Sequence, residues 1–148
     1  MYKNIATLCF ISVISLFTVS ANAQTPGATL PQAQQYQVDG FLRDVKFNDA
    51  KAVKKALASG MSPNAMDDKG NSALTIAITE KSLDVAKLLI DTPSIDLERP
   101  NLAGETPVML AAFTGSEVLV RYLVENRQVE INKPGWSALH YAATNGHL

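Results

Sequence analysis

The chain has 148 residues and a formal net charge of −1, with 47% hydrophobic and 18% charged residues. This length suits one domain with a hydrophobic core and is short for two. The near-neutral charge excludes the broad basic surface with which proteins hold nucleic acids or anionic membranes.

The N-terminus has the three parts of an export signal. Lys3 is positive, residues 5–19 are apolar and uncharged, and Ala21-Asn22-Ala23 has the small side chains that a signal peptidase accepts. The alternative is a membrane-spanning anchor, but that needs about 20 apolar residues, more than this segment offers. We therefore expect a cleaved signal peptide at residues 1–23 and export to the periplasm or, alternatively, secretion, with no stable membrane anchor after cleavage.

Residues 24–37 contain two prolines, a glycine and few side chains that could be buried. This composition is typical of a disordered spacer. The single cysteine, Cys9, lies inside the expected signal. The mature chain would therefore form no disulfide, which suits an oxidising compartment.

One pattern, which begins with a glycine and continues through a hydroxyl residue into an apolar run, occurs three times. It covers residues 70–77, 104–111 and 135–142. The offsets are 104 − 70 = 34 and 135 − 104 = 31 residues. The 34-residue offset also relates the apolar face of a second helix, in which Val85 corresponds to Leu119 and Leu89 to Leu123. Such a period indicates a repeat architecture.

The second copy shows how one unit forms. Gly104 can adopt a tight turn, Thr106 is a typical N-cap, and Pro107 suits a first helical turn. Gly115 ends this thin helix, and residues 117–125 are predicted to form a bulkier second helix. Because neither helix can bury its apolar stripe alone, units must stack.

These residues resemble the ankyrin repeat family. Its Thr-Pro-Leu-His-x-Ala signature is similar to Thr106-Pro107-Val108-Met109-Leu110-Ala111 and to Ser137-Ala138-Leu139-His140-Tyr141-Ala142. The resemblance covers residues 38–148 and implies an all-α solenoid of about four units, at about 38–66, 67–100, 101–134 and 135–148. It also implies that His140 hydrogen-bonds the Ser137 hydroxyl.

Three places depart from the family pattern. The first unit lacks the opening signature, so we interpret it as an N-terminal cap. The third connecting finger is shortened and contains Pro134. The fourth unit is incomplete, from which we expect Leu123 and Leu139 to be poorly covered, and the chain to be a fragment.

The titratable residues do not suggest an enzyme, a cofactor or a metal. His140 and His147 are seven apart on either side of Gly146, which is not the spacing of metal ligands on one helix face. Asp67-Asp68 lacks further acids at a spacing that would complete an oxygen cage, so a solvated finger tip is favoured. We find no set of nucleophile, base and acid.

The resemblance implies that finger tips and the exposed side of each first helix form a concave face that binds a protein partner. We expect a monomer that binds through Phe113 and Trp136 as anchors, with Ile76 and Leu110 turned outward. The alternative is structural: Phe113 would fill the space between first helices, and Trp136 would pack over the shortened finger. Alternatives are a regulatory subunit or inhibitor of a periplasmic enzyme, or a secreted effector that binds a host protein. The candidate partner-binding residues are Met66, Asp67, Lys69, Ile76, Arg99, Asn101, Leu102, Glu105, Leu110, Phe113, Lys133, Trp136 and Tyr141.

The signal peptide gives the first testable prediction. Mass spectrometry of the exported protein should show Gln24 as its first residue, because Ala21 and Ala23 fit the small subsites of a signal peptidase. Retention of Met1 in the exported fraction would contradict cleavage.

Overall fold

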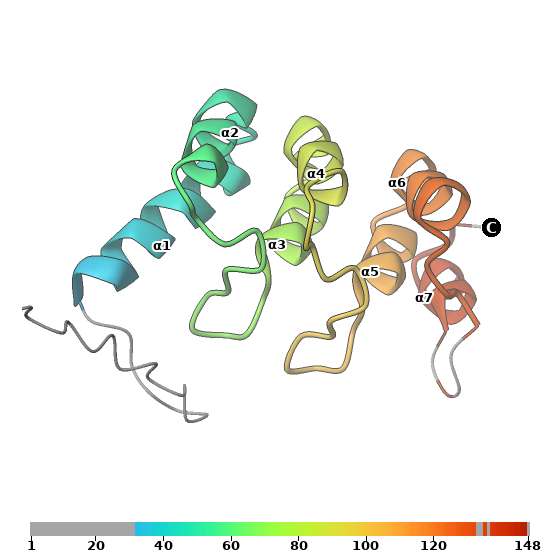
Figure 1. The fold of residues 1–148 in the computed structure, drawn as a ribbon. Helices are drawn as coiled ribbons and strands as arrows, with labels where there is room; N and C mark the ends of the chain where they lie inside the picture. The colour runs from blue at the N-terminus through green and yellow to red at the C-terminus, as the bar shows by residue number, and fades with distance from the viewer. Residues whose placement is uncertain (1–31, 133–134, 136, 148) are drawn as a thin grey trace, which may run out of the picture.

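A computed structural model describes residues 32–132, 135 and 137–147, and these form seven α-helices and one π-helical turn without a β-strand. In Figure 1 the helices make two rows. The outer row is α2, α4 and α6, and the inner row is α1, α3, α5 and α7. The elements are α1 (Gln32–Lys46), α2 (Ala50–Ala58), α3 (Ala73–Thr79), α4 (Leu83–Ile90), α5 (Pro107–Phe113), α6 (Glu117–Arg121), η1 (Tyr122–Asn126) and α7 (Ala138–Thr144).

Each helix pair packs on the next pair, so the predicted all-α solenoid is confirmed. In the inner row α1 contacts α3, α3 contacts α5, and α5 contacts α7. In the outer row α4 contacts both α2 and α6. Long connections, which we call fingers, project on one side between an outer helix and the next inner helix (Figure 1). Finger 1 spans residues 61–72 and finger 2 spans residues 95–106.

Local chemistry sets the helix ends. The Ser72 hydroxyl accepts a hydrogen bond from the Thr75 N–H at 3.2 Å, and the Asp49 carboxylate caps α2 by accepting from the Ala52 N–H at 2.9 Å. Pro107 begins α5, as predicted. After α5 the chain turns at Gly115, whose φ of 69° is left-handed and favours glycine.

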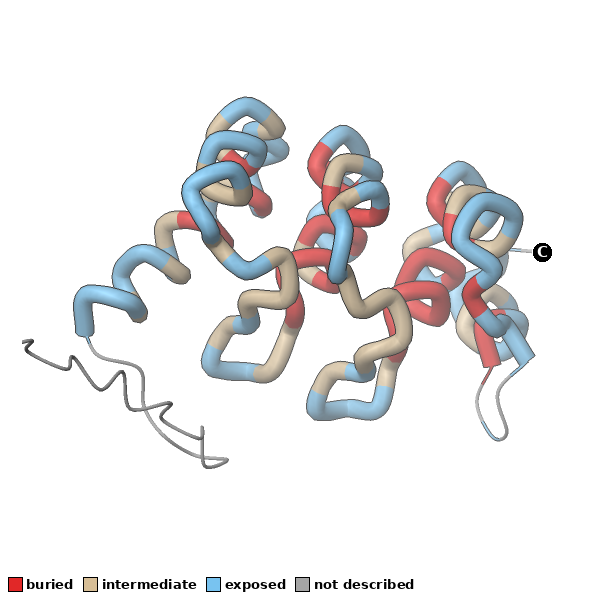
Figure 2. The backbone as a smooth tube through the Cα atoms, in the orientation of Figure 1, coloured by how far each residue is buried: buried red, intermediate tan, exposed pale blue. Residues whose placement is uncertain are grey.

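The core lies between the units. Leu74, Leu89, Val108 and Leu119 are completely buried or nearly so, and Figure 2 shows buried residues gathered where helices face one another. Full burial of such a side chain contributes about 1.5–3 kcal/mol. In the inner row Ala77 and Ala111 are both 0% exposed, so these small side chains are part of the core between units.

Helix α1 begins earlier than predicted. We expected a disordered spacer through Gln37, but Gln32–Gln37 are helical, so the expectation is wrong for these residues. Both prolines precede Gln32, and glutamine and alanine are good helix formers. A hydrogen bond of 2.9 Å from Gln35 Nε2 to Asp39 Oδ1 links successive turns.

Two further expectations about the C-terminal units are confirmed in part. Residues 117–125 are helical as predicted, but α6 ends at Arg121 and a wider π-helical turn, η1, continues it. There Tyr122 donates to the Asp91 carboxylate of the preceding unit at 2.7 Å. Leu123 is 0% exposed rather than poorly covered, because it is part of the core, whereas Leu139 is 68% exposed as expected.

The expected signal peptide (residues 1–23) and residues 24–31 of the expected spacer lie outside the described residues. In the part that is described, no helix has both the length and the apolarity to cross a membrane.

Hydrogen bonds between units recur at the repeat period. Asn64 donates from Nδ2 to the Ser94 carbonyl and accepts at Oδ1 from the Asp96 N–H, both at 2.8 Å. One repeat later, Glu98 accepts through Oε1 from the Glu130 N–H at 3.2 Å. Fingers 1 and 2 are thereby each attached to the following unit.

Asn64 supplies a test of this attachment. Asn64→Ala removes both bonds to the next unit and should lower the free energy of unfolding by about 1–2 kcal/mol. The matched control is Asn126→Ala, at an exposed asparagine on the outer row. Urea unfolding followed by circular dichroism measures both, and equal midpoints for the two variants would show that the Asn64 bonds do not couple the units.

Candidate functional site

The candidate surface consists of the finger tips and the exposed side of the inner row, and we call it the inner face. In Figure 1 both fingers leave the array on the side of α1, α3, α5 and α7. The outer helices α2, α4 and α6 lie on the opposite side. A ligand on the inner face would therefore meet side chains from several units.

Finger 1 is closed by one carboxylate. Asp67 Oδ1 accepts from the backbone N–H groups of Lys69 and Asn71 at 2.9 and 2.8 Å, and Asp67 Oδ2 accepts from Asn71 Nδ2 at 3.0 Å. The Asp67 N–H donates to the Asn71 carbonyl at 3.0 Å across the hairpin. Asp67, a predicted partner-binding residue, is thus occupied in shaping the finger, while the Lys69 side chain is exposed.

Finger 2 repeats this design with the groups exchanged. Asn101 Oδ1 accepts from the N–H groups of Ala103 and Glu105, both at 3.0 Å, and Asn101 Nδ2 donates to Glu105 Oε2 at 2.8 Å. The amide now precedes the carboxylate, whereas in finger 1 the carboxylate comes first. The 34-residue offset, which pairs Asp67 with Asn101, was the sequence signal for this shared role.

Other predicted tip residues are accessible. Met66 is 41% exposed and Leu102 is 82% exposed. The Leu102 side chain nevertheless lies against Gly70, since a Cβ on Gly70 would stand 2.7 Å from Leu102 Cγ. Because Leu102 belongs to finger 2 and Gly70 to finger 1, the two fingers are in contact with each other. Within finger 2, Arg99 is held by Asp96 through a salt bridge of 3.2 Å between Nε and Oδ2.

Of the predicted site residues on the inner helices, Phe113 is 40% exposed, as expected. Ile76 and Tyr141 are half-buried and pack against the core, so they are only partly accessible. Leu110 was expected to face outward, but it is 7% exposed and belongs to the core. Because α5 lies between α3 and α7, its flanks are covered on both sides.

Phe113 and Tyr141 form an aromatic pair across two units. Their ring centroids are 6.3 Å apart and the planes make an angle of 77°, an edge-to-face arrangement. Burial raises the pKa of the Tyr141 phenol above its ordinary value of 10.0, and the charge of Glu105 and a hydrogen bond to its carboxylate raise it further. This pair joins α5, α7 and finger 2 on one surface.

The sequence analysis missed the contribution of α1. A groove of about 410 Å³ lies between α1, finger 1 and α3, and we call it the α1–α3 groove. The 34-residue offset relates Leu42 of α1 to Ile76 of α3 and could have revealed it. Its lining residues are Asp39, Leu42, Arg43, Lys46, Asp67, Lys69, Asn71, Thr75, Ile76, Thr79 and Glu80.

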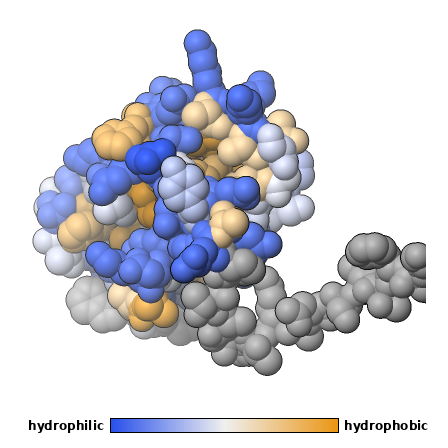
Figure 3. Space-filling view, turned by 90° about the vertical axis from the view of Figure 1, so that its left-hand side faces the viewer, coloured by the Kyte–Doolittle hydropathy of each residue, from blue (hydrophilic) through white to orange (hydrophobic). Residues whose placement is uncertain are grey.

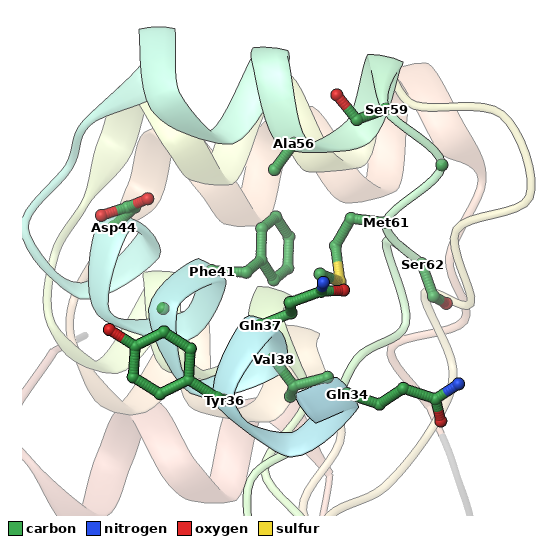
Figure 4. Close-up of a pocket in the computed structure, with 12 residues that line it drawn as sticks. Gln34, Tyr36, Gln37, Val38, Phe41, Asp44, Ala56, Ser59, Met61 and Ser62 are labelled. Carbon is green, nitrogen blue, oxygen red and sulfur yellow. The ribbon is translucent and has the colours of Figure 1, made fainter. Parts of the chain in front are cut away.

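A second groove opens at the N-terminal end, between α1 and the start of finger 1. It has a volume of about 640 Å³, and Figure 4 shows the Phe41 ring directed toward Ala56 and Met61. Gln34 and Gln37 border the groove. Figure 3, which views this end, shows apolar patches interrupted by hydrophilic side chains. The end face therefore lacks a continuous apolar surface in this view.

The histidines have local partners. His140 Nδ1 lies 2.8 Å from the Ser137 hydroxyl, so the contact that the resemblance implied is confirmed. The His147 ring packs over Gly115 and lies 3.3 Å from Asn145 Nδ2. Among the residues that the structure describes, no three His, Cys, Asp or Glu side chains are grouped to hold a metal ion.

Two of the predicted site residues cannot be placed, because Lys133 and Trp136 lie outside the described residues. Trp136 as an anchor therefore stays a prediction. The same holds for the shape of the shortened third finger.

Comparison with known proteins agrees with the repeat architecture that the structure shows. Residues 43–132 and 94–148 match the family model for ankyrin repeats (3 copies). The chain is 35% identical over 104 residues to human Ankyrin repeat domain-containing protein 63, covering 66% of this chain and 27% of that protein.

Two longer proteins are similar over nearly the same share of the chain. Human Neurogenic locus notch homolog protein 2 is 35% identical over 101 residues, which are 66% of this chain and 4% of that protein. Glycerophosphocholine phosphodiesterase gde1 of Schizosaccharomyces pombe is 31% identical over 98 residues, which are 65% of this chain and 9% of that protein. The chain thus spans a small part of the relatives' length.

The raised pKa of Tyr141 yields a pH prediction. Folding favours the neutral phenol, so its contribution to stability is complete below pH 10.0 and is lost as the pH rises through the higher pKa of the folded state. Glu105→Gln removes a carboxylate that favours the neutral phenol, so the pKa of Tyr141 should fall but stay raised by burial. Titration of the ¹³Cζ resonance by NMR measures it.

The matched control is Glu125→Gln, which removes an exposed carboxylate from the outer row. This control should leave the Tyr141 titration unchanged. An unaltered Tyr141 pKa in Glu105→Gln would contradict the contact between finger 2 and α7.

Proposed function

Because the chain belongs to the ankyrin repeat family, whose repeats generally serve as scaffolds for interaction between proteins, we propose that it is an exported, monomeric, non-catalytic scaffold. It recognises a protein partner through the inner face. The repeats match a part of each relative, so what those relatives do as whole proteins is not transferred to this chain.

The observation that carries the proposal is the pairing of rigid fingers with exposed apolar side chains. The side-chain oxygens of Asp67 and Asn101 accept backbone hydrogen bonds that hold the hairpins of both fingers. Met66, Leu102 and Phe113 are each at least 40% exposed on or beside these elements. Exposed aromatic and apolar residues on a preorganised surface provide contact area at a small entropic cost.

A role without catalysis is supported by how the inner-face acids are used. Asp67 and Glu105 hydrogen-bond within their own fingers, and Glu80 forms a salt bridge of 3.1 Å with Lys46. Groups occupied in this way do not converge on a reacting atom. The similarity to a phosphodiesterase covers 9% of that protein and brings no activity to this chain.

Export is supported by the sequence of residues 1–23, with its positive start, apolar run and small-residue cleavage pattern. The periplasm is the compartment we propose, with secretion as the alternative. A regulatory or inhibitory role toward an enzyme, or binding to a host protein, would use the same surface.

The proposal predicts which face carries affinity. Peptides selected by display against the folded chain provide a ligand for calorimetry. Phe113→Ala should weaken their binding by about 2 kcal/mol, roughly 30-fold, because an exposed aromatic anchor is lost. Helical content should stay nearly unchanged, since the ring is 40% exposed.

The matched control is Val118→Ala on the outer row, at a side chain that is 53% exposed. It should leave affinity unchanged. Weaker binding by the Val118 variant together with unaltered binding by the Phe113 variant would place the binding surface on the outer helices instead.

A further inference from the structure

The α1–α3 groove holds charges of both signs, but its acids are already engaged. Asp67 accepts three hydrogen bonds inside finger 1. Glu80 is paired with Lys46 at 3.1 Å, and Asp39 accepts from Gln35 Nε2 at 2.9 Å. No lining carboxylate is thus left without a polar partner.

Two of the three lining cations are not engaged. Arg43 and Lys69 are exposed and form no salt bridge with any residue that the structure describes. Arg43 belongs to α1 and Lys69 to finger 1, and both line the same groove. The lining holds three cations and three carboxylates, so Arg43 and Lys69 are distinguished by the absence of an ion-pair partner and not by a surplus of positive charge.

The groove also has an apolar floor. Leu42 is 7% exposed and Ile76 is half-buried, and both line the groove beside the two cations. A carboxylate side chain could pair with Arg43 and Lys69 while its aliphatic stem or a neighbouring side chain covers Ile76. Two cations above an apolar floor complement an acidic peptide better than a nucleic acid backbone, which needs an extended row of cations.

The other end of the inner face is aromatic. Phe113 of α5 and Tyr141 of α7 form the edge-to-face pair, and Phe113 is 40% exposed. The groove lies between α1 and α3, and the pair lies between α5 and α7, so the two are separated by two steps of the inner row. Packed helices are about 8–10 Å apart, which makes about 16–20 Å. An extended peptide covers that distance in about five or six residues, at about 3.3 Å each.

We propose that the inner face recognises an extended segment of a partner protein with an acidic side chain at one position and an aromatic or large aliphatic one about five or six residues away. The acid pairs with Arg43 and Lys69, and the apolar side chain packs on Phe113 and Tyr141. This inference rests on the proposed function, for which it names the chemistry of the partner.

The test is a panel of fluorescent 12-residue peptides in a serine and glycine background. Each carries one glutamate and one phenylalanine at separations from two to nine residues, in both orders, and binding to the full chain is followed by anisotropy. Affinity should be highest at a separation of about five or six. Replacing the glutamate of the best peptide by glutamine should weaken binding at least tenfold.

Protein variants then assign the acid to its site. The double variant Arg43→Gln/Lys69→Gln should bind the best glutamate peptide at least tenfold more weakly than the unaltered chain does. This variant should bind the glutamine peptide no worse than the glutamate peptide. The control Lys54→Gln/Lys55→Gln changes the charge equally on exposed lysines of α2 and should bind both peptides like the unaltered chain. Circular dichroism checks that each variant is folded.

Several results would overturn the inference: affinity that does not depend on separation, equal binding of glutamate and glutamine peptides, or equal losses in the two double variants. Tighter binding of single-stranded oligothymidylate, lost in Arg43→Gln/Lys69→Gln, would assign the groove to nucleic acid. If display-selected ligands are weakened by Phe113→Ala but not by the groove variant, this inference alone is wrong. If neither change weakens them, the inner face as the binding surface is wrong as well.

Discussion

The structure depends on one constraint: most of its helices are too short to be stable in isolation. Helices α3 and α5 have seven residues each, well below the about 12–15 that an isolated helix needs to be even marginally stable in water. Their stability comes from apolar side chains shared with neighbouring units, such as Leu74 and Val108, which are at most 1% exposed. Hydrogen bonds across units add to this, for example from Asn145 Nδ2 to the Phe113 carbonyl at 2.8 Å. Each unit is therefore stable only when it packs against a neighbouring folded unit.

The same constraint separates core from function. Stacking uses the flanks of the inner helices for the core, as the burial of Leu110 shows. What remains for a ligand is the edge of each inner helix and the fingers, whose shape is set by Asp67 and Asn101 rather than by the core. Exposed side chains such as Arg43 and Lys69 can therefore vary without a large effect on stacking, which is how one fold can serve many partners.

The fold was largely predictable because its signals are local and repeated. The glycine turns, the Thr106-Pro107 helix start and the 34-residue offset each point to the same unit. The errors arose where a side chain's surroundings come from another unit. Periodicity along α5 could not show that α3 and α7 cover Leu110, and the missing signature in the first unit hid Arg43 from the candidate site. The start of α1 was missed because two prolines upstream dominated the composition of the segment.

The central claim is that stacked units present one binding surface on the inner face, and hydrogen exchange tests it most directly. Exchange is compared with and without a display-selected ligand. Slower exchange is predicted at finger backbone N–H groups, such as those of Lys69 and Ala103, and along α3 and α5, with no change in α2, α4 and α6 beyond a general stabilisation. Protection confined to the outer helices, with the fingers exchanging as in the free chain, would contradict the account.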